Sequence, residues 1–102
     1  MKKNRSDVIV IASATAASGQ EAELEAALRE AAGPTREQPG CVEFSLYRSG
    51  ASKSTIIGFE RWASEAEHQK HLQGAHIQRL MARMGGILAG PPVIVSYQVI
   101  DE

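Results

Sequence analysis

The sequence predicts an α+β fold in which strands and helices follow the order β-α-β-β-α-β. An apolar, β-branched run covers residues 8–12, and two further strand-like runs at 41–48 and 54–62 flank a short loop of small residues. Ser18 and Ser64 each precede a glutamate by three residues, which is the capping-box pattern of a helix N-terminus. Strand patterns therefore alternate with helix starts along the chain.

The first half of the chain is expected to contain one strand and one helix. The run at 8–12 is apolar at odd and even positions alike, so both faces of this strand should be covered. The helix should begin after Ser18, and Gly33-Pro34 should end or kink it. Its apolar face is formed by residues at helical spacing, namely Leu24, Ala27, Leu28 and Ala31.

The two middle strands should form a hairpin. Residues 49–52 read Ser-Gly-Ala-Ser and supply its loop, and the strand at 54–62 is apolar on both faces around Ile56-Ile57. The strand at 41–48 alternates: Val42, Phe44 and Leu46 share one face, and Glu43, Ser45 and Tyr47 share the other.

A second helical region and a last strand complete the order. The helical region should begin after Ser64, break at Gly74 and end at Gly85-Gly86. The last strand should cover 93–100. Two βαβ-like halves joined by a hairpin form the ferredoxin-like arrangement, with a four-stranded antiparallel sheet.

Association of two chains follows from the strand patterns. Two helices can cover only one face of a four-stranded sheet. The strands at 8–12 and 54–62 are nevertheless apolar on both faces. A second copy of the same sheet is the simplest cover for the open face, so the sequence predicts a homodimer.

Length and composition fit one globular domain over residues 1–102, with residues 1–6 as a flexible tail. A hydrophobic fraction of 43% and a charged fraction of 23% oppose disorder. A net charge of -1 argues against nucleic acid or an anionic membrane as a partner. No apolar segment approaches the roughly 20 residues that cross a bilayer.

Cysteine use indicates the cytoplasm. Cys41 is the single cysteine, so an internal disulfide is impossible. The basic residues before 8–12 and the Ala-Ser-Ala that follows resemble a signal peptide, but the apolar run is shorter than the about 7–15 residues such a peptide needs. A reducing compartment is the simplest setting.

Residues suited to chemistry concentrate in one stretch. Trp62, His68, His71 and His76 are the only tryptophan and the only histidines of the chain, and they follow one another closely. Histidine suits proton transfer near neutral pH, and an indole offers a flat wall to an aromatic ring. Each of these residues also fits a purely structural role, in the core or on a helix surface. Their spacing matches no zinc motif, so we expect no metal site.

Several short motifs resemble the antibiotic biosynthesis monooxygenase domain family, whose small members include quinol monooxygenase-like proteins. The resemblance covers nearly the whole chain and rests on the order of these segments: Pro34-Thr35, Pro39-Gly40-Cys41, Glu60-Arg61-Trp62, His71-Leu72 and His76.

The resemblance implies a dimeric α/β barrel with a pocket between sheet and helices in each protomer. It implies oxygenation of phenolic or quinol substrates by O2 with no metal, haem or flavin cofactor. The motif carries over at Trp62, His71 and His76. We therefore predict His71 and His76 as catalytic, and Trp62, His68 and Tyr47 as substrate-binding. Tyr47 is chosen for its polar tip on an otherwise apolar strand.

Two functional hypotheses remain open beside a cofactor-free monooxygenase of a small aromatic quinol or polyphenol. One is a non-catalytic small-molecule-binding or stress-related dimer, and the other is ring isomerisation or cyclisation with the same base. Haem-degrading relatives resemble this chain at His76. They also use an asparagine and a tryptophan at positions where this chain has small or apolar residues, Ala66 among them.

Overall fold

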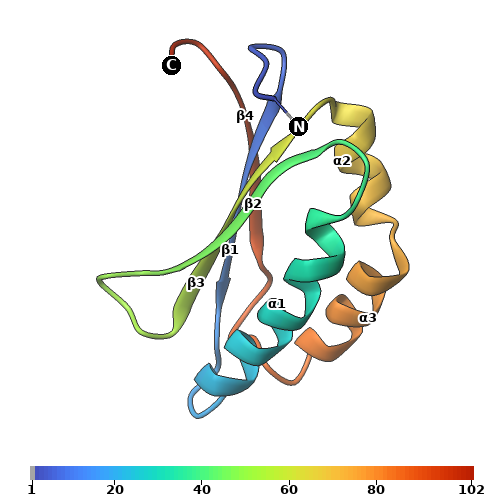
Figure 1. Cartoon of the computed structure of the whole chain (residues 1–102). Coiled ribbons are helices and arrows are strands. Elements are labelled where there is room, and N and C mark those ends of the chain that lie inside the picture. Colours follow the sequence, from blue (N-terminus) through green and yellow to red (C-terminus); the bar gives the residue numbers. More distant parts are fainter. Residues whose placement is uncertain (1) are drawn as a thin grey trace.

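The computed structural model describes residues 2–102, which form four strands and three helices. The elements alternate as predicted (Figure 1). In chain order they are β1 (Val8–Thr15), α1 (Glu21–Arg36), β2 (Cys41–Arg48), β3 (Thr55–Trp62), α2 (Glu65–Leu72), α3 (Ala75–Met84) and β4 (Val93–Gln98).

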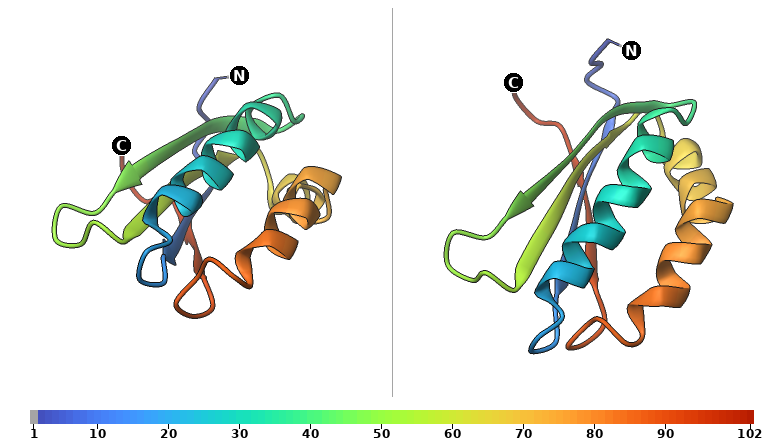
Figure 2. Two further views of the ribbon diagram at one scale, coloured as in Figure 1. Left: turned by 90° about the horizontal axis from the view of Figure 1, so that it is seen from below. Right: turned by 60° about the horizontal axis from the view of Figure 1, so that its bottom comes forward.

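The strands form one antiparallel sheet in the order β2-β3-β1-β4. All three helices lie on the same side of this sheet, with α1 beside α3, and the other face carries no helix of the described chain (Figure 2). This arrangement confirms the predicted ferredoxin-like fold. The last strand ends at Gln98, two residues earlier than the pattern indicated.

The first helix differs from its sequence prediction at both ends. Gln20 is its N-cap and makes no side-chain capping bond, so the capping box expected at Ser18 does not form. The helix also continues through Gly33-Pro34 to Arg36. Both residues lie on its exposed side, and the buried Thr35 closes the last turn by donating its hydroxyl to the Ala31 carbonyl at 2.8 Å. The predicted stop at Gly33-Pro34 was therefore wrong.

The second helical region follows its sequence pattern closely. The Ser64 hydroxyl accepts a hydrogen bond from the Glu67 amide at 3.2 Å, which confirms this capping prediction. Gly74 separates α2 from α3, and α3 ends at Met84 immediately before Gly85. No helix in the described part of the chain is both long and apolar enough to cross a membrane.

Strand alternation divides the sheet side chains between two faces. Val10 of β1 is fully buried on the helix-facing side, in register with Glu60 of β3. Its neighbours Ile9 and Ile11 lie on the open face, next to exposed side chains of β4. Every residue of β4 is exposed.

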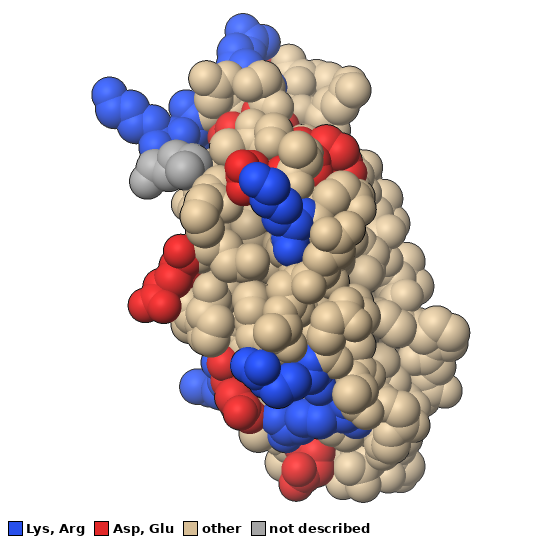
Figure 3. Space-filling view, turned by 90° about the vertical axis from the view of Figure 1, so that its right-hand side faces the viewer, with Lys and Arg blue, Asp and Glu red and all other residues tan. Residues whose placement is uncertain are grey.

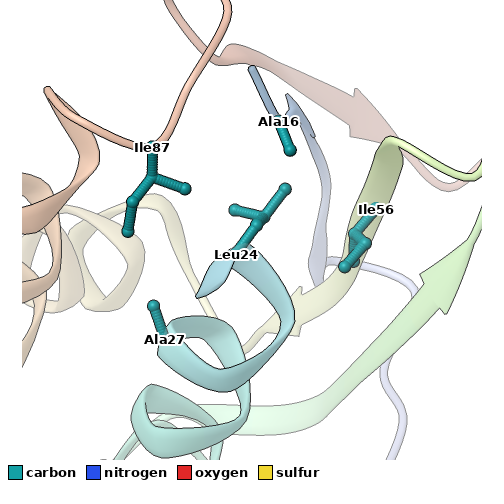
Figure 4. Packing of buried hydrophobic residues seen from close by; sticks show 5 residues of the cluster. All are labelled: Ala16, Leu24, Ala27, Ile56 and Ile87. Carbon is teal, nitrogen blue, oxygen red and sulfur yellow. The ribbon is translucent and has the colours of Figure 1, made fainter. Parts of the chain in front are cut away.

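A compact apolar cluster holds the helices on the sheet at one end of the molecule. Its buried members come from β3, α1 and the segments that follow β1 and α3 (Figure 4). They are Ala16, Leu24, Ala27, Ile56 and Ile87.

The segment before β1 is partly anchored. Residues 2–6 are exposed, but the Asn4 amide donates to Asp7 at 2.8 Å and its carbonyl accepts from Arg61 at 3.2 Å. Arg61 is buried and also binds Asp7 and Glu102 near the other chain end. The flexibility expected for residues 1–6 stays a prediction, and residue 1 lies outside the described residues.

Candidate active site

Polar side chains are buried together at the end of the sheet opposite the apolar cluster. Glu60 and Trp62 project from β3 toward the helices, and His68 and His71 project from α2 to meet them. Each of the four is at most 5% exposed. They are brought together because alternate strand residues share a face, whereas residues three apart share a helix face.

The carboxylate of Glu60 links this group. Its Oε1 atom accepts a hydrogen bond from the Trp62 indole nitrogen at 2.9 Å. The same oxygen lies 3.8 Å from Nε2 of His71. The indole and imidazole rings pack with their centroids 4.6 Å apart, so Trp62 holds both neighbours in place.

The other nitrogen of His71 is bonded to the segment that follows α1. Nδ1 lies 2.6 Å from the amide oxygen of Gln38. An amide oxygen can only accept, so Nδ1 donates and Nε2 is left with a free lone pair. That lone pair is the one on the Glu60 side of the ring.

A small cavity of about 120 Å³ lies between the sheet and α3. Glu60 and His71 are the ionisable groups among the described residues that line it. Apolar side chains form most of the remaining wall: Phe44, Leu46 and Ile56 from the sheet, and Ile77, Leu80, Met81 and Met84 from α3. The cavity therefore presents one acid–base pair to an apolar interior.

Burial governs the protonation of this pair. It raises the pKa of Glu60, although the bond from Trp62 opposes the rise. Burial, with His68 and His76 nearby, lowers the pKa of His71 from 6.5 to about 4. Both effects favour the uncharged forms, because neither charge is well solvated here. At neutral pH the imidazole of His71 is free to accept a proton.

Trp62 and His68 lie behind the residues that form the cavity wall. Neither is among the residues that line the cavity. His68 packs beside Trp62 with ring centroids 6.1 Å apart, and its Nδ1 atom is buried with no hydrogen-bond partner among the described residues. Trp62 contacts Glu60 and His71, and His68 stacks beside His71, so both rings pack behind the two cavity residues.

His76 and Tyr47 lie away from the cavity. The Nε2 atom of His76 is 3.1 Å from the Thr35 hydroxyl, and its ring lines a surface groove between α1 and α3. Tyr47 is 54% exposed and lines a surface hollow with Arg29 and Arg36. Its polar tip pointed to a substrate role, but β2 directs it outward, because Leu46 takes the neighbouring cavity-facing position.

Glu60 lines the cavity but is not among the site residues predicted from the sequence. It belongs to the motif quoted for the family, but a lone carboxylate on a strand is usually solvent-exposed. The available signal was its position two residues before Trp62, which places both side chains on one face.

The site offers little to a metal or to haem. Residues 2–102 contain no group of three or more His, Cys, Asp and Glu side chains arranged to hold a metal ion. A cavity of about 120 Å³ suits one ring rather than a tetrapyrrole, and His76, the expected haem ligand, lies outside it. The residues present do not fit haem.

Comparison with known proteins identifies the family. A sequence model described as antibiotic biosynthesis monooxygenase matches residues 7–83. The chain belongs to the antibiotic biosynthesis monooxygenase family. The "Putative monooxygenase Rv0793" of Mycobacterium tuberculosis is 30% identical over 69 residues, which cover 68% of this chain and 67% of that protein. The family resemblance predicted from the motifs is thereby confirmed.

Solved structures of other proteins superpose closely on this chain. The structure of Rv0793 matches with a TM-score of 0.89 and 29% identity, over 95% of this chain and 98% of its own. PA3566 from Pseudomonas aeruginosa matches with a TM-score of 0.89 and 23% identity, over 97% and 100%, and supports the fold alone. An uncharacterized Synechocystis protein is 26% identical over 67% of this chain, but the match spans about half of that protein, 46%.

Proposed function

We propose that this protein is a cofactor-independent monooxygenase that oxidises a small aromatic quinol or polyphenol with O2. The observation that carries the proposal is the cavity, an apolar space with one carboxyl and one neutral imidazole in its wall. Family membership supports the reaction class, because the matched family is described as monooxygenases. The geometry supports the type of substrate.

The size of the cavity favours a single ring. A cavity of about 150 Å³ lined by apolar side chains binds benzene, which is close to the 120 Å³ available here. Met81 and Met84 can adapt to a larger ring, since methionine side chains repack readily. A fused polycyclic substrate would require α3 to move away from the sheet.

The proposed chemistry needs a proton acceptor and a dry site. A substrate hydroxyl placed between Oε1 of Glu60 and Nε2 of His71 can give its proton to His71. The ionised form of Glu60, which the bond from Trp62 favours against the effect of burial, then stabilises the imidazolium. The quinolate that remains can pass electrons to O2 directly. One oxygen atom enters the ring, the other leaves as water, and the quinol becomes a hydroxylated quinone.

Oxygen uptake with a panel of single-ring quinols tests this function. His71→Ala should lower kcat/KM by about 10²- to 10⁴-fold, the usual contribution of a general base. His76→Ala is the matched control, because its ring does not line the cavity, and should change the rate less than tenfold. Retention of the rate in both variants would remove the acid–base role.

A second candidate is a dimer that binds a small aromatic molecule without transforming it. The observation that favours it is the deep burial of His71, which lowers the pKa of the imidazole to about 4 and makes it a weak base. Thermal denaturation should then show ligand-induced stabilisation in the absence of oxygen uptake. Uptake that depends on His71 would exclude this candidate.

We also infer that the open face of the sheet is covered by a second copy of the chain. Val95 is 40% exposed and Tyr97 is 48% exposed, and they pair with Ile11 and Ile9 of β1. Monomeric proteins rarely expose a contiguous apolar patch of this kind. Since Val10 faces the helices, Ile9 is the residue of β1 that would meet the partner.

Substitution on this face tests the dimer. Ile9→Asp would bury an unpaired charge twice in a symmetric interface and should give a monomer or insoluble protein. Ser52→Asp introduces the same charge on the exposed hairpin loop and should leave association unchanged. A wild-type chain that sediments as an 11.0 kDa monomer at micromolar concentration would contradict the dimer.

A further inference from the structure

The C-terminal end of α1 contacts two histidines of the α2–α3 pair through two polar side chains. Thr35 lies 3.1 Å from Nε2 of His76, and Gln38 lies 2.6 Å from Nδ1 of His71. The two contacts involve opposite nitrogens of the two rings. Thr35 is fully buried and Gln38 is half-buried, so both bonds are largely shielded from water.

The direction of each hydrogen bond follows from its partners. A hydroxyl has one proton, and Thr35 gives its proton to the Ala31 carbonyl at 2.8 Å. Thr35 must therefore accept from His76, which carries its proton on Nε2. The amide oxygen of Gln38 also accepts, so His71 carries its proton on Nδ1. One helix end thus selects opposite tautomers in two neighbouring histidines.

We propose that Gln38 is a positioning residue that holds His71 in the Nδ1–H tautomer and turns its bare Nε2 toward Glu60 and the cavity. The value of this arrangement for catalysis rests on the proposed function. In the other tautomer, Nε2 would present a proton to the cavity and could not take one from a substrate hydroxyl. Gln38 comes from the turn between α1 and β2. It lies outside the motifs that carry the family resemblance, immediately before Pro39-Gly40-Cys41.

The surroundings of His71 make this selection necessary. His68 from α2, His76 from α3 and Glu60 from β3 are the ionisable groups that face it. None of them makes a hydrogen bond to His71, because Glu60 is 3.8 Å away and the histidine contacts are between rings. The tautomer of His71 therefore depends on Gln38.

Nitrogen NMR of the ¹⁵N-histidine-labelled protein without substrate tests the proposal directly. At pH 7, His71 should show a protonated Nδ1 and a bare Nε2, and His76 should show the reverse. Spectra of His68→Asn and His76→Asn assign the signals. A wild-type His71 that carries its proton on Nε2, with the Gln38 amide turned to donate, would overturn the proposal.

Three variants separate positioning from mere packing. Gln38→Leu removes the acceptor and should shift His71 toward the Nε2–H form or a mixture. Gln38→Glu keeps an acceptor, so Nδ1 should stay protonated, and the added charge should raise the pKa of His71 above its wild-type value. Thr35→Val is the matched control, which should change the tautomer of His76 alone. An unchanged His71 tautomer in folded Gln38→Leu would refute the role of Gln38.

Kinetics with an active quinol connect the tautomer to catalysis. Gln38→Leu should lower kcat/KM by about 10- to 100-fold, by analogy with the loss seen when a metal-binding histidine loses its outer hydrogen-bond partner. Gln38→Glu should retain the rate and move the acid limb of the pH profile upward. The predicted tautomers without quinol oxidation by the wild type would refute the proposed function and leave the positioning role intact.

Discussion

The layer between helices and sheet has two ends of opposite character. At the end near the hairpin loop, Leu24 and Ile56 pack in an entirely apolar cluster (Figure 4). At the other end, Glu60, Trp62 and His71 are buried as deeply but are held by hydrogen bonds. The first end can stabilise the fold without specifying chemistry. Burying ionisable groups at the second end is energetically unfavourable. In natural proteins such groups concentrate at functional sites.

The surface on the α2–α3 side gives no sign of this difference. On the face formed by α2 and α3, acidic and basic side chains are interspersed, with wide uncharged areas between them (Figure 3). Ion pairs of these helices include Lys70 with Glu67 within α2 and Arg83 of α3 with Glu30 of α1. Surface charge is therefore balanced here, and the ionisable groups that matter chemically lie beneath it.

The largest expected effect is at the apolar end. Leu24→Ala removes a fully buried side chain and should lower the free energy of unfolding by about 2–5 kcal/mol, because a cavity remains where packing is tight. The rate of quinol oxidation by the folded fraction should stay unchanged. Urea unfolding together with oxygen uptake checks both, and a large loss of rate per folded molecule would show that the two ends are coupled.

Acid should destabilise the polar end. His71 has a folded pKa of about 4 and an ordinary value of 6.5, so between these pH values the unfolded chain binds the proton and the folded chain does not. The free energy of unfolding should therefore fall by roughly 3 kcal/mol as pH drops through this window.

The raised pKa of Glu60 changes the free energy of unfolding with pH in the opposite direction, so its contribution has to be removed from this measurement. Its raised pKa contributes stability at low pH that is lost as pH rises. Denaturation should therefore be followed in Glu60→Gln, where this opposing contribution is absent. Burial also lowers the pKa values of His68 and His76, which act in the same direction as His71, so the share of His71 has to be obtained by difference. Adding His71→Gln to that background should make the curve less steep, and the difference between the two curves is the His71 contribution; an unchanged slope would assign the effect to other groups.

A smaller loss is expected from Trp62→Phe. The indole bond to Glu60 disappears, and a buried acceptor without its donor costs about 1–3 kcal/mol. The pKa of Glu60 should rise further, because the Trp62 bond is what opposes its increase. Carboxyl ¹³C NMR titration measures the pKa and urea unfolding the stability. A Glu60 pKa below the wild-type value would contradict the contact.

The smallest change in stability should come from Glu60→Gln. The amide keeps an acceptor for Trp62 and matches the uncharged form that burial favours, so the free energy of unfolding should move by no more than about 1 kcal/mol. Oxidation should nevertheless fall, because an amide cannot stabilise the His71 imidazolium. A variant that is strongly destabilised yet fully active would reverse the roles of the two ends.

The fold could be predicted from local patterns because each depends on near neighbours in the chain. The Ser64 cap and the break at Gly74 act within one helical turn, and both appear where the sequence indicated. Ser18 and Gly33-Pro34 were misleading because tertiary packing decides those ends of α1, where Leu24 and Thr35 are fully buried. The bond from Thr35 to Ala31 then holds the last turn.

The sequence by itself determined the family, the order of elements and the stretch in which Trp62, His68 and His71 lie. Only the tertiary structure decided which of these groups meet. Glu60 joins the site through strand alternation, Gln38 reaches it from the turn after α1, and His76 is directed away by Thr35. The physical reason is range: capping and alternation act over a few residues, whereas a buried hydrogen bond between Gln38 and His71 joins groups 33 positions apart.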